Sequence, residues 1–201
     1  MKDTVVVFAR APRLGTVKRR LAKDIGDRAA LRFHTGTLLR LLRDLLRNRR
    51  FRTVLALTPD GAKDRLPVRV VRMAQGRGDI GERMTTVCRS FRHGNVAIIG
   101  SDIPDANAAD LRAAFHALGR HDAVFGPAED GGYWLVALGP RRPAQPFVNA
   151  RWSTTHALAD TLRNFRGRRV AHTRVLRDVD TARDLPMHPR RPKLTGKDET
   201  R

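Results

Sequence analysis

Short apolar runs alternate with amphipathic stretches along most of the chain. Thr4–Ala9 and Val96–Ile99 are apolar almost throughout and rich in β-branched residues, a pattern typical of central strands that are buried on both faces. Ala29–Arg47 repeats leucine at helical spacing on one face and places arginines opposite, which predicts an amphipathic helix. The chain therefore begins with a buried strand, followed by a loop and a long surface helix.

The rest of the chain continues this alternation. Further strands are predicted at Thr53–Thr58, Val68–Met73, Asp122–Phe125, Tyr133–Leu138 and Val170–Leu176. Further helices are predicted from Asp79 to about Arg92, from Asn107 to about Gly119, from Ser153 to about Phe165, and briefly after Thr181. Strands separated by helices at this spacing indicate βαβ units, and so an α/β fold with a mostly parallel sheet covered on both sides. Ligands of such sheets bind beyond the carboxyl ends of the strands.

The length of 201 residues fits one domain, over residues 1–187, followed by a charged, proline-rich tail at residues 188–201 that we expect to be mobile. No apolar run is long enough to span a membrane. The N-terminus lacks the apolar core and cleavage site of a signal peptide, and the lone Cys88 cannot form an internal disulfide. Together these features predict a cytoplasmic protein.

The chain carries 40 Lys and Arg against 20 Asp and Glu, a net charge of +20. Such a charge favours anionic partners, from phosphorylated small molecules to nucleic acid. Nearly all the cations are arginines spread evenly along the chain, which GC-rich codon usage alone can produce. Aromatic residues make up only 5%, and no zinc finger, basic zipper or ribonucleoprotein motif is present. A basic nucleic-acid-binding protein therefore stays an alternative of another class, and nucleic acid is not the partner we expect.

The loop after the first strand, Arg10–Leu21, has the residues expected of a phosphate site. Gly15 allows the backbone to approach a ligand closely, and Lys18 and Arg20 follow where a phosphate chain would lie. The loop is neither a Walker A motif nor a G-x-G-x-x-G motif. A solvated basic loop that leads into a helix is the alternative interpretation.

Carboxylates follow two of the predicted strands. Asp102 comes directly after the most buried strand, where a hard oxygen ligand suits Mg or Mn bound together with substrate phosphates. Asp105 either assists it or starts the next turn. Glu129–Gly132, two acids and two glycines, joins two strands. The acids could bind hydroxyls or metal and the glycines could expose N–H groups to a ligand, or the four residues form a simple turn.

The remaining polar segments have structural explanations of their own. Asp178 or Asp180 could reach a metal, but Thr181 and Asp184 explain this segment as the cap of a short helix. The histidines share no motif and form no H-x-x-x-H pair, so the sequence predicts no zinc site. Cys88 lies in mid-helix among apolar residues and is expected in the core.

Six stretches occur together in the order found in one known family. They are Phe8–Gly15 with Lys18–Ala22, Gly78–Met84, Ile99–Pro104, Gly126–Tyr133, Trp152–Thr154 and Asp178–Thr181. Over roughly residues 4–186 the chain resembles the bacterial GT-A-like transferases of the nucleotide-diphospho-sugar transferase superfamily that are often labelled radical-SAM/selenodomain-associated. Some members of that family are known as arsenosugar-biosynthesis glycosyltransferases. More distantly, the chain is similar to the guanylyltransferases of coenzyme F420 and molybdenum cofactor synthesis.

This resemblance implies a three-layer αβα, Rossmann-like GT-A fold and a nucleotide-activated donor bound with Mg or Mn. It implies nucleotide or phosphate contacts from Arg10, Gly15, Lys18, Arg20, Gln75, Gly81 and Glu82. Asp102 would ligate the metal, and Glu129 to Gly132 would face the acceptor, which Gly131 and Gly132 would bind. The chain departs from the family at Arg19, where the family usually has threonine.

Two transferase reactions fit such a site. In glycosyl transfer an acceptor hydroxyl attacks the anomeric carbon of an NDP-sugar, and an inverting enzyme needs a base, for which Glu129 or Asp130 is the candidate. In nucleotidyl transfer a phosphorylated small molecule, already ionised, attacks an NTP without a base. The two acids favour glycosyl transfer to a small acceptor, and guanylyltransferase-like nucleotidyl transfer is the alternative. The Leu- and Arg-rich helices could also support a homodimer.

Overall fold

Seven strands form a single sheet in the order β3-β2-β1-β4-β6-β5-β7. The computed structural model describes residues 2–185. The strands are β1 (Asp3–Arg10), β2 (Phe51–Thr58), β3 (Val71–Ala74), β4 (Val96–Gly100), β5 (Ala123–Pro127), β6 (Tyr133–Leu138) and β7 (Val170–His172). Neighbouring strands are parallel, except that β6 runs antiparallel to both β4 and β5. The predicted α/β fold with a mostly parallel sheet is therefore confirmed.

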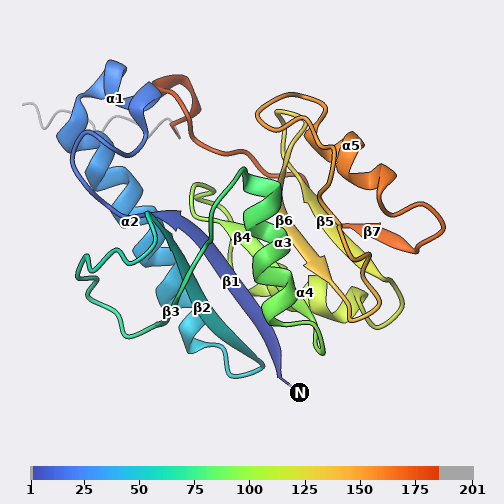
Figure 1. Cartoon of the computed structure of the whole chain (residues 1–201). Coiled ribbons are helices and arrows are strands. Elements are labelled where there is room, and N and C mark those ends of the chain that lie inside the picture. Colours follow the sequence, from blue (N-terminus) through green and yellow to red (C-terminus); the bar gives the residue numbers. More distant parts are fainter. Residues whose placement is uncertain (1, 186–201) are drawn as a thin grey trace, which may run out of the picture.

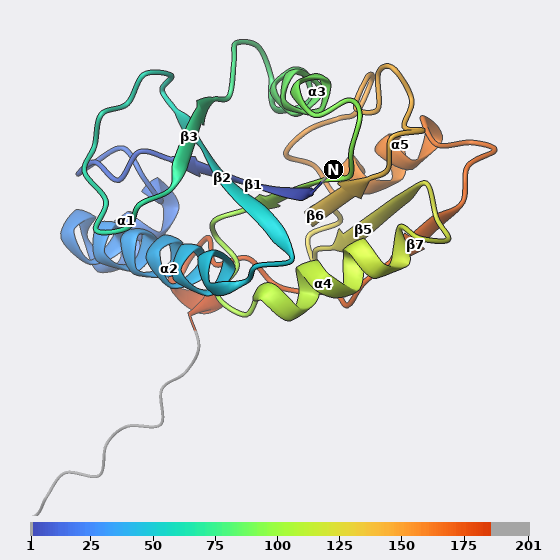
Figure 2. The same cartoon turned by 90° about the horizontal axis from the view of Figure 1, so that it is seen from below.

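Helices cover both faces of the sheet (Figures 1 and 2). The helices are α1 (Arg19–Ile25), α2 (Asp27–Arg47), α3 (Ile80–Ser90), α4 (Ala108–Ala117), α5 (Ala157–Arg163) and the 3-10 helix η1 (Ala182–Asp184). α2 and α4 pack on one face of the sheet, and α3 and α5 pack on the other. α1 and η1 contact each other beyond these layers. The fold is thus a three-layer helix–sheet–helix arrangement.

The uniform apolar character of β1 follows from this layering. Val5 and Val7 face the α2/α4 layer, whereas Val6 and Phe8 face the α3/α5 layer, because successive side chains of a strand point to opposite faces. All four side chains are buried. A strand covered on both faces has to be apolar at every position, which is the pattern seen in the sequence.

Two of the N-terminal boundaries differ from the prediction. The first loop ends at Lys18, because Arg19 already begins α1. This helix has a single buried side chain, Leu21, and one apolar position leaves no periodicity to detect. The strand predicted from Val68 begins at Val71, because β3 is an edge strand that pairs only with four residues of β2.

Two C-terminal boundaries also differ. The helix predicted from Ser153 begins at Ala157, since Ser153 has a φ of 59° that an α-helix does not contain. The strand predicted to reach Leu176 ends at His172, and Leu176 makes an isolated bridge instead. The predicted tail at residues 188–201 lies outside the described residues. Within residues 2–185, no helix has the length and apolar character needed to cross a membrane.

After β7 the chain crosses back over the carboxyl ends of the strands to α1 (Figure 1). Val179 packs against Leu21 of α1, and its N–H donates to the Asp102 carbonyl oxygen at 3.3 Å. These contacts hold the segment Asp178–Asp180 against the end of β4. Residues about 75 positions apart in the sequence therefore meet at the edge of the sheet where α/β proteins bind their ligands.

Candidate functional site

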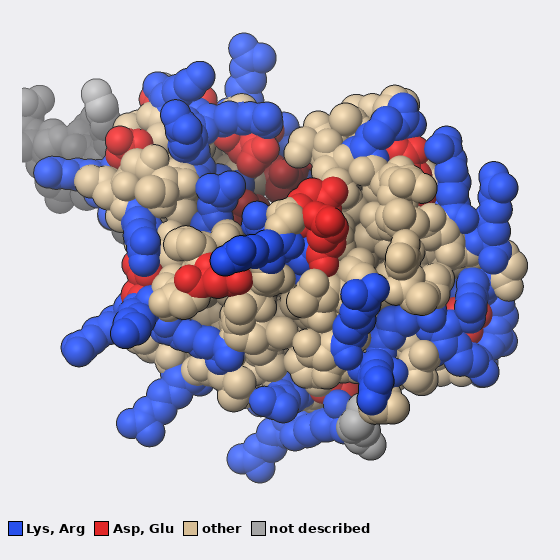
Figure 3. Space-filling model, viewed as in Figure 1, with Lys and Arg blue, Asp and Glu red and all other residues tan. Residues whose placement is uncertain are grey.

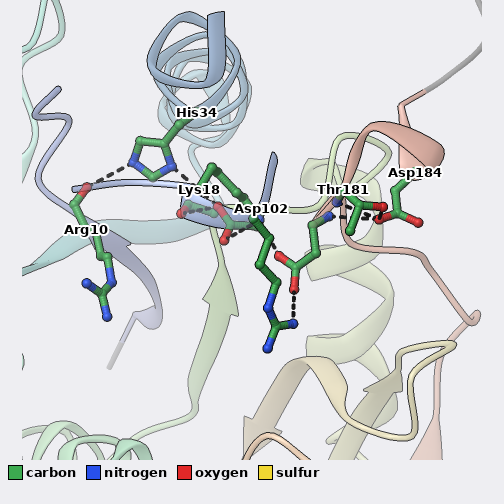
Figure 4. Close-up of polar contacts among 9 residues, drawn as sticks. Arg10, Lys18, His34, Asp102, Thr181 and Asp184 are labelled. Atoms are coloured by element: carbon green, nitrogen blue, oxygen red, sulfur yellow. Dashed lines mark hydrogen bonds and ion pairs between the residues drawn. The ribbon is translucent and has the colours of Figure 1, made fainter. Parts of the chain in front are cut away.

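The Lys18 ammonium joins three segments of the chain at the carboxyl end of the sheet (Figure 4). Its Nζ lies 2.9 Å from Asp102 Oδ2, just after β4, and 2.9 Å from Asp180 Oδ1 on the C-terminal segment. Arg20 Nη1 lies 3.3 Å from the other Asp180 oxygen. The Lys18 side chain is 4% exposed, whereas the Asp102 and Asp180 side chains are 40% and 43% exposed. A buried cation thus holds two half-exposed carboxylates.

His34, buried on α2, lies on the other side of Asp102. Its Nε2 donates to the Arg10 carbonyl oxygen at 3.0 Å, since a carbonyl can only accept, and its Nδ1 lies 3.5 Å from Asp102 Oδ1. Burial acts to raise the pKa of Asp102, but the contact with His34 and the charge of Lys18 outweigh it and lower that pKa to about 2. Burial likewise opposes the charge of Lys18, but Asp102 and Asp180 raise its pKa above the ordinary value. Both partners are therefore charged at neutral pH.

Two more carboxylates lie close to this ion pair. Burial raises the pKa of Asp178, and the charges of Asp180 and Asp130 raise it further, against the opposing effect of Lys18. These aspartates are therefore near enough to repel one another. Figure 3 shows Asp and Glu side chains gathered around the hollow of this face, with Lys and Arg side chains both beside them and over much of the surrounding surface.

Two cavities adjoin at Asp102, which lines both. The larger, of about 630 Å³, is called the cationic cavity here because of its basic side chains, which are Arg10, Lys18, Arg19, Arg20 and Arg83. The smaller, of about 270 Å³, is called the acidic cavity. Its walls are apolar and aromatic residues from α3, β6 and the segment before α5, and its charged residues are Asp102, Asp130 and Asp178. The two cavities thus differ in charge on either side of one carboxylate.

The cationic cavity collects several of the residues predicted to contact a nucleotide, namely Arg10, Lys18, Arg20 and Gln75. Gln75 is buried, and its amide donates to the carbonyl oxygens of Ala9 and Ala56 at 3.1 and 2.8 Å. Its side chain therefore ties the strand ends together. Gly15 has a φ of 72°, which favours glycine in the first loop, but it does not line the cavity.

Gly81 and Glu82 lie in the first turn of α3 and line a third cavity, of about 660 Å³, which is separate from the cationic cavity. Glu82 and Asp79 form the predicted capping box, each accepting the other's backbone N–H at 2.8 Å. Gly81 packs against Trp152 so closely that a Cβ would lie 2.7 Å from the indole ring. Both residues therefore serve the start and the packing of α3.

The turn between β5 and β6 borders the acidic cavity through Asp130 and Gly132. Glu129 is 61% exposed, lies 3.8 Å from Arg177, and lines neither the cationic nor the acidic cavity. The Gly132 N–H donates to Asp130 Oδ1 at 2.8 Å, and the Gly131 N–H donates to a carbonyl oxygen of the same turn at 3.1 Å. The two N–H groups are thus used within the turn, and Asp130 is the acid that reaches the cavity.

Spacing along the chain carries no signal for His34, which reaches Asp102 only because α2 packs under the end of β1. Asp178 and Asp180 do stand out in the sequence as acids, but their position at the site follows from the fold of the C-terminal segment. Within residues 2–185, no group of three or more His, Cys, Asp or Glu side chains is placed to hold a metal ion by itself. A metal at Asp102 would need further oxygen ligands from its substrate.

A protein family described as "Uncharacterized protein conserved in bacteria (DUF2064)" matches residues 41–154, which is more than half of the chain. No curated protein matches the chain. A solved structure from Desulfovibrio desulfuricans G20, assigned to the nucleotide-diphospho-sugar transferases, is 27% identical. It superposes with a TM-score of 0.83 over 90% of this chain and 84% of that chain.

Two other solved structures resemble the chain at 10% identity, a level that shows the fold alone. The 4-diphosphocytidyl-2C-methyl-D-erythritol synthase of Anaerococcus prevotii DSM 20548 has a TM-score of 0.61 over 91% of this chain and 94% of that chain. A CMP:2-keto-3-deoxy-manno-octonic acid synthetase complexed with CTP has a TM-score of 0.55 over 90% and 94%. The expected nucleotide-diphospho-sugar transferase fold is confirmed.

Proposed function

This chain belongs to the DUF2064 family of proteins conserved in bacteria, and we propose that it is a metal-dependent transferase that uses a nucleotide-activated donor. The observation that carries the proposal is the position of Lys18, whose ammonium lies between Asp102 and Asp180 in the wall of the cationic cavity. The likeness to a structure assigned to the nucleotide-diphospho-sugar transferases supports the same class of reaction.

The donor would bind in the cationic cavity. Its volume of about 630 Å³ lies in the range of small-molecule sites. Arg10, Arg20 and Arg83 can grip phosphate oxygens bidentately, and Lys18 adds a point charge. Because Lys18 is buried, a phosphate that reaches it is shielded from water, which strengthens their attraction. The diphosphate of the donor would therefore lie along the first loop, with its reacting end toward Asp102.

The donor set fits Mg or Mn if substrate oxygens complete the coordination. Asp102 and Asp180 lie on either side of the Lys18 ammonium, each with an oxygen 2.9 Å from its nitrogen, and both carboxylates line the cationic cavity, where a metal bound with the donor would take one or both of them as ligands. One or two carboxylates together with substrate phosphates is a common ligand set for Mg. When bound, the ion would neutralise charge on the diphosphate as it leaves.

Four side chains of the protein would position the donor and the acceptor around this metal. His34 lies 3.5 Å from one oxygen of Asp102 and Lys18 lies 2.9 Å from the other, so the carboxylate has a neighbour on each side. Lys18 and Arg20 hold the phosphates against the end of β1. Asp130 borders the acidic cavity and is the group placed to take a proton from an acceptor hydroxyl there. This position favours glycosyl transfer from an NDP-sugar to a small acceptor.

Nucleotidyl transfer from an NTP to a phosphorylated small molecule is the second candidate. It is supported by the likeness of the fold to a synthetase that was solved with CTP bound. In that reaction the acceptor phosphate would have to occupy the cavity lined by Asp102, Asp130 and Asp178. Glycosyl transfer therefore requires the acidic cavity to bind an acceptor through its hydroxyl group, whereas nucleotidyl transfer requires the same cavity to bind a phosphate.

A thermal-shift screen tests the proposed function. The panel contains NTPs, NDPs and NDP-sugars, each with Mg, Mn or EDTA. We expect one base or one NDP-sugar to raise the melting temperature only with metal, by about 5 °C at a ligand concentration a hundredfold above Kd. Asp102→Asn should abolish this shift, because the variant lacks the charge that attracts the metal.

Asp105→Asn is the matched control. Asp105 lies three residues further along the same loop, is exposed and lines neither the cationic nor the acidic cavity. It should keep the full metal-dependent shift. Equal shifts with every polyanion, regardless of metal and of Asp102, would contradict the proposal. They would mean that the charge of +20 acts alone and would favour a nucleic-acid-binding protein.

A further inference from the structure

The acidic cavity combines two kinds of wall. Apolar and aromatic surface comes from Ile80 and Met84 of α3, from Trp134 of β6 and from Trp152. Carboxylates come from Asp102, Asp130 and Asp178. Among residues 2–185, no Lys or Arg lines this cavity, although the chain as a whole carries twice as many basic as acidic residues. The described charged residues that line the acidic cavity are therefore all negative, whereas the chain as a whole has a net positive charge.

The cations nearest in the chain line the cationic cavity or pair with other acids, and none of those in residues 2–185 lines the acidic cavity. Lys18 is held by Asp102 and Asp180. Arg174 and Arg177, which precede Asp178 on the C-terminal segment, pair with Asp110 and with Asp184 respectively. Asp130 and Asp178 are thus left without a paired cation among the ion pairs of the described residues. Within this part of the chain, the charged side chains that line the cavity are therefore all carboxylates, and two of the three have no cation beside them.

We propose that the acidic cavity binds the acceptor as a neutral or cationic, hydroxyl-bearing small molecule with an apolar face, such as a sugar or amino sugar, and rejects its phosphate esters. This inference rests on the proposed function and selects its glycosyl-transfer form. Carboxylates accept hydrogen bonds from hydroxyl and ammonium groups, and indole rings pack against the apolar face of a sugar or attract an ammonium. A phosphate would instead face like charges in a partly desolvated place.

The reaction that follows is balanced without any further reagent. The acceptor hydroxyl oxygen forms a bond to the anomeric carbon of the donor. The bond between that carbon and the diphosphate oxygen breaks, and its electron pair leaves with the nucleoside diphosphate. The hydroxyl proton passes to Asp130, the carboxylate that borders the cavity. Lys18 and Arg20 hold the departing diphosphate on the other side of Asp102.

Two tryptophans allow binding in the acidic cavity to be followed by fluorescence. Trp134 and Trp152 are the only tryptophans of the chain, and both line the acidic cavity. Neither lines the cationic cavity. Intrinsic tryptophan fluorescence therefore reports occupation of the acidic cavity, whereas binding of phosphates to the cationic cavity is measured separately by the thermal shift described above.

The test compares glucosamine with glucosamine 6-phosphate, which differ only by the phosphate group. We expect glucosamine to change the tryptophan fluorescence of the full chain at a concentration about tenfold lower than the ester. The double variant Asp130→Asn/Asp178→Asn should reduce this preference to about threefold or less, because asparagine keeps the size and hydrogen-bonding oxygen but removes the charge. Either single variant serves if the double variant does not fold.

Glu129→Gln is the matched control, since it removes one negative charge from the same turn but outside the cavity. It should keep the preference of the wild-type chain. An equal or stronger response to the ester, an unchanged preference in the double variant, or no response to either sugar would overturn the inference. Failure of the proposed function has a different signature, which is the loss of any metal-dependent nucleotide shift while the fluorescence preference remains.

Discussion

At the scale of single residues, Asp102 connects the separate parts of the site. It receives Lys18 on one oxygen and faces His34 with the other, and it lines both the cationic and the acidic cavity. The sequence predicts its importance, because an aspartate directly after a buried strand faces the ligand edge of the sheet. Its two partners come from the first loop and from α2, and neither follows from the local sequence.

The lowered pKa of Asp102 predicts a pH dependence of stability. The pKa is about 2 in the folded chain against an ordinary value of 3.8. The ionised carboxylate therefore stabilises the fold above the ordinary value, and this contribution is lost as the pH falls from 3.8 towards 2. We expect Asp102→Asn to lower the free energy of unfolding at about pH 6, and the difference from wild type to shrink steadily below about pH 4.

Urea unfolding of both proteins across this pH range checks the prediction, and comparison at each pH cancels effects that other carboxylates exert on both. A difference that stays constant down to about pH 2 would assign the stabilisation to the size or hydrogen bonding of the side chain and not to its charge.

At the scale of secondary structure, one feature of α3 follows from its local sequence, and another follows only from its packing. The capping box of Asp79 and Glu82 is visible in the sequence and is present in the structure. Gly81 lies between these residues, and the reason for its glycine is not local. A Cβ there would lie 2.7 Å from the Trp152 ring and 2.9 Å from the Phe147 carbonyl oxygen.

Two helical glycines should respond in opposite ways to alanine. Alanine is favoured over glycine in a helix by about 1 kcal/mol. Gly36 lies in α2, and an added Cβ there would have nothing within 4 Å. Gly36→Ala should therefore raise the free energy of unfolding by about 0.5–1 kcal/mol. At Gly81 overpacking should outweigh this gain, and Gly81→Ala should lower the free energy of unfolding by about 1–3 kcal/mol. Chemical denaturation measures both; a stabilised Gly81→Ala would show that α3 moves away from Trp152 at little cost.

At the scale of the whole molecule, the net charge of +20 surrounds a hollow lined by aspartates. Net charge far from zero destabilises a compact state by self-repulsion, and salt screens that repulsion. The same screening weakens non-specific binding of polyanions. The charge therefore acts on stability and on non-specific contacts, whereas the cationic and acidic cavities depend on where individual charges lie.

Salt should separate these two effects. Raising NaCl from about 50 to about 500 mM should raise the melting temperature of the free chain and abolish heparin binding, because both respond to overall charge. The metal-dependent nucleotide shift should be reduced but retained, since buried charges are screened less than exposed ones. Thermal shift and heparin elution measure the two quantities. A nucleotide shift that vanishes together with heparin binding would mean that nucleotides bind by charge alone.

The sequence by itself determined the fold class and the positions of most strands. Buried parallel strands are apolar at every position, and capping residues mark where α3 and α4 begin. These features depend on residues that are close together in the sequence, so the sequence alone predicts them. The nucleotide-diphospho-sugar transferase fold implied by the six ordered stretches is confirmed, as is membership of a bacterial family. The association with radical-SAM proteins, the metal and the individual site residues stay predictions.

Only the tertiary structure decided which of the candidate residues lie together. It placed Asp180 on Lys18 and brought His34 to Asp102, over separations that no periodicity spans. It also turned Glu129 away from the cavity that Asp130 borders, although the two acids are adjacent in the chain. The physical reason is the same in each case. A strand or helix is set by neighbours within a few residues, whereas a charged site depends on distances in space between loops whose paths are fixed by the packing of the entire fold.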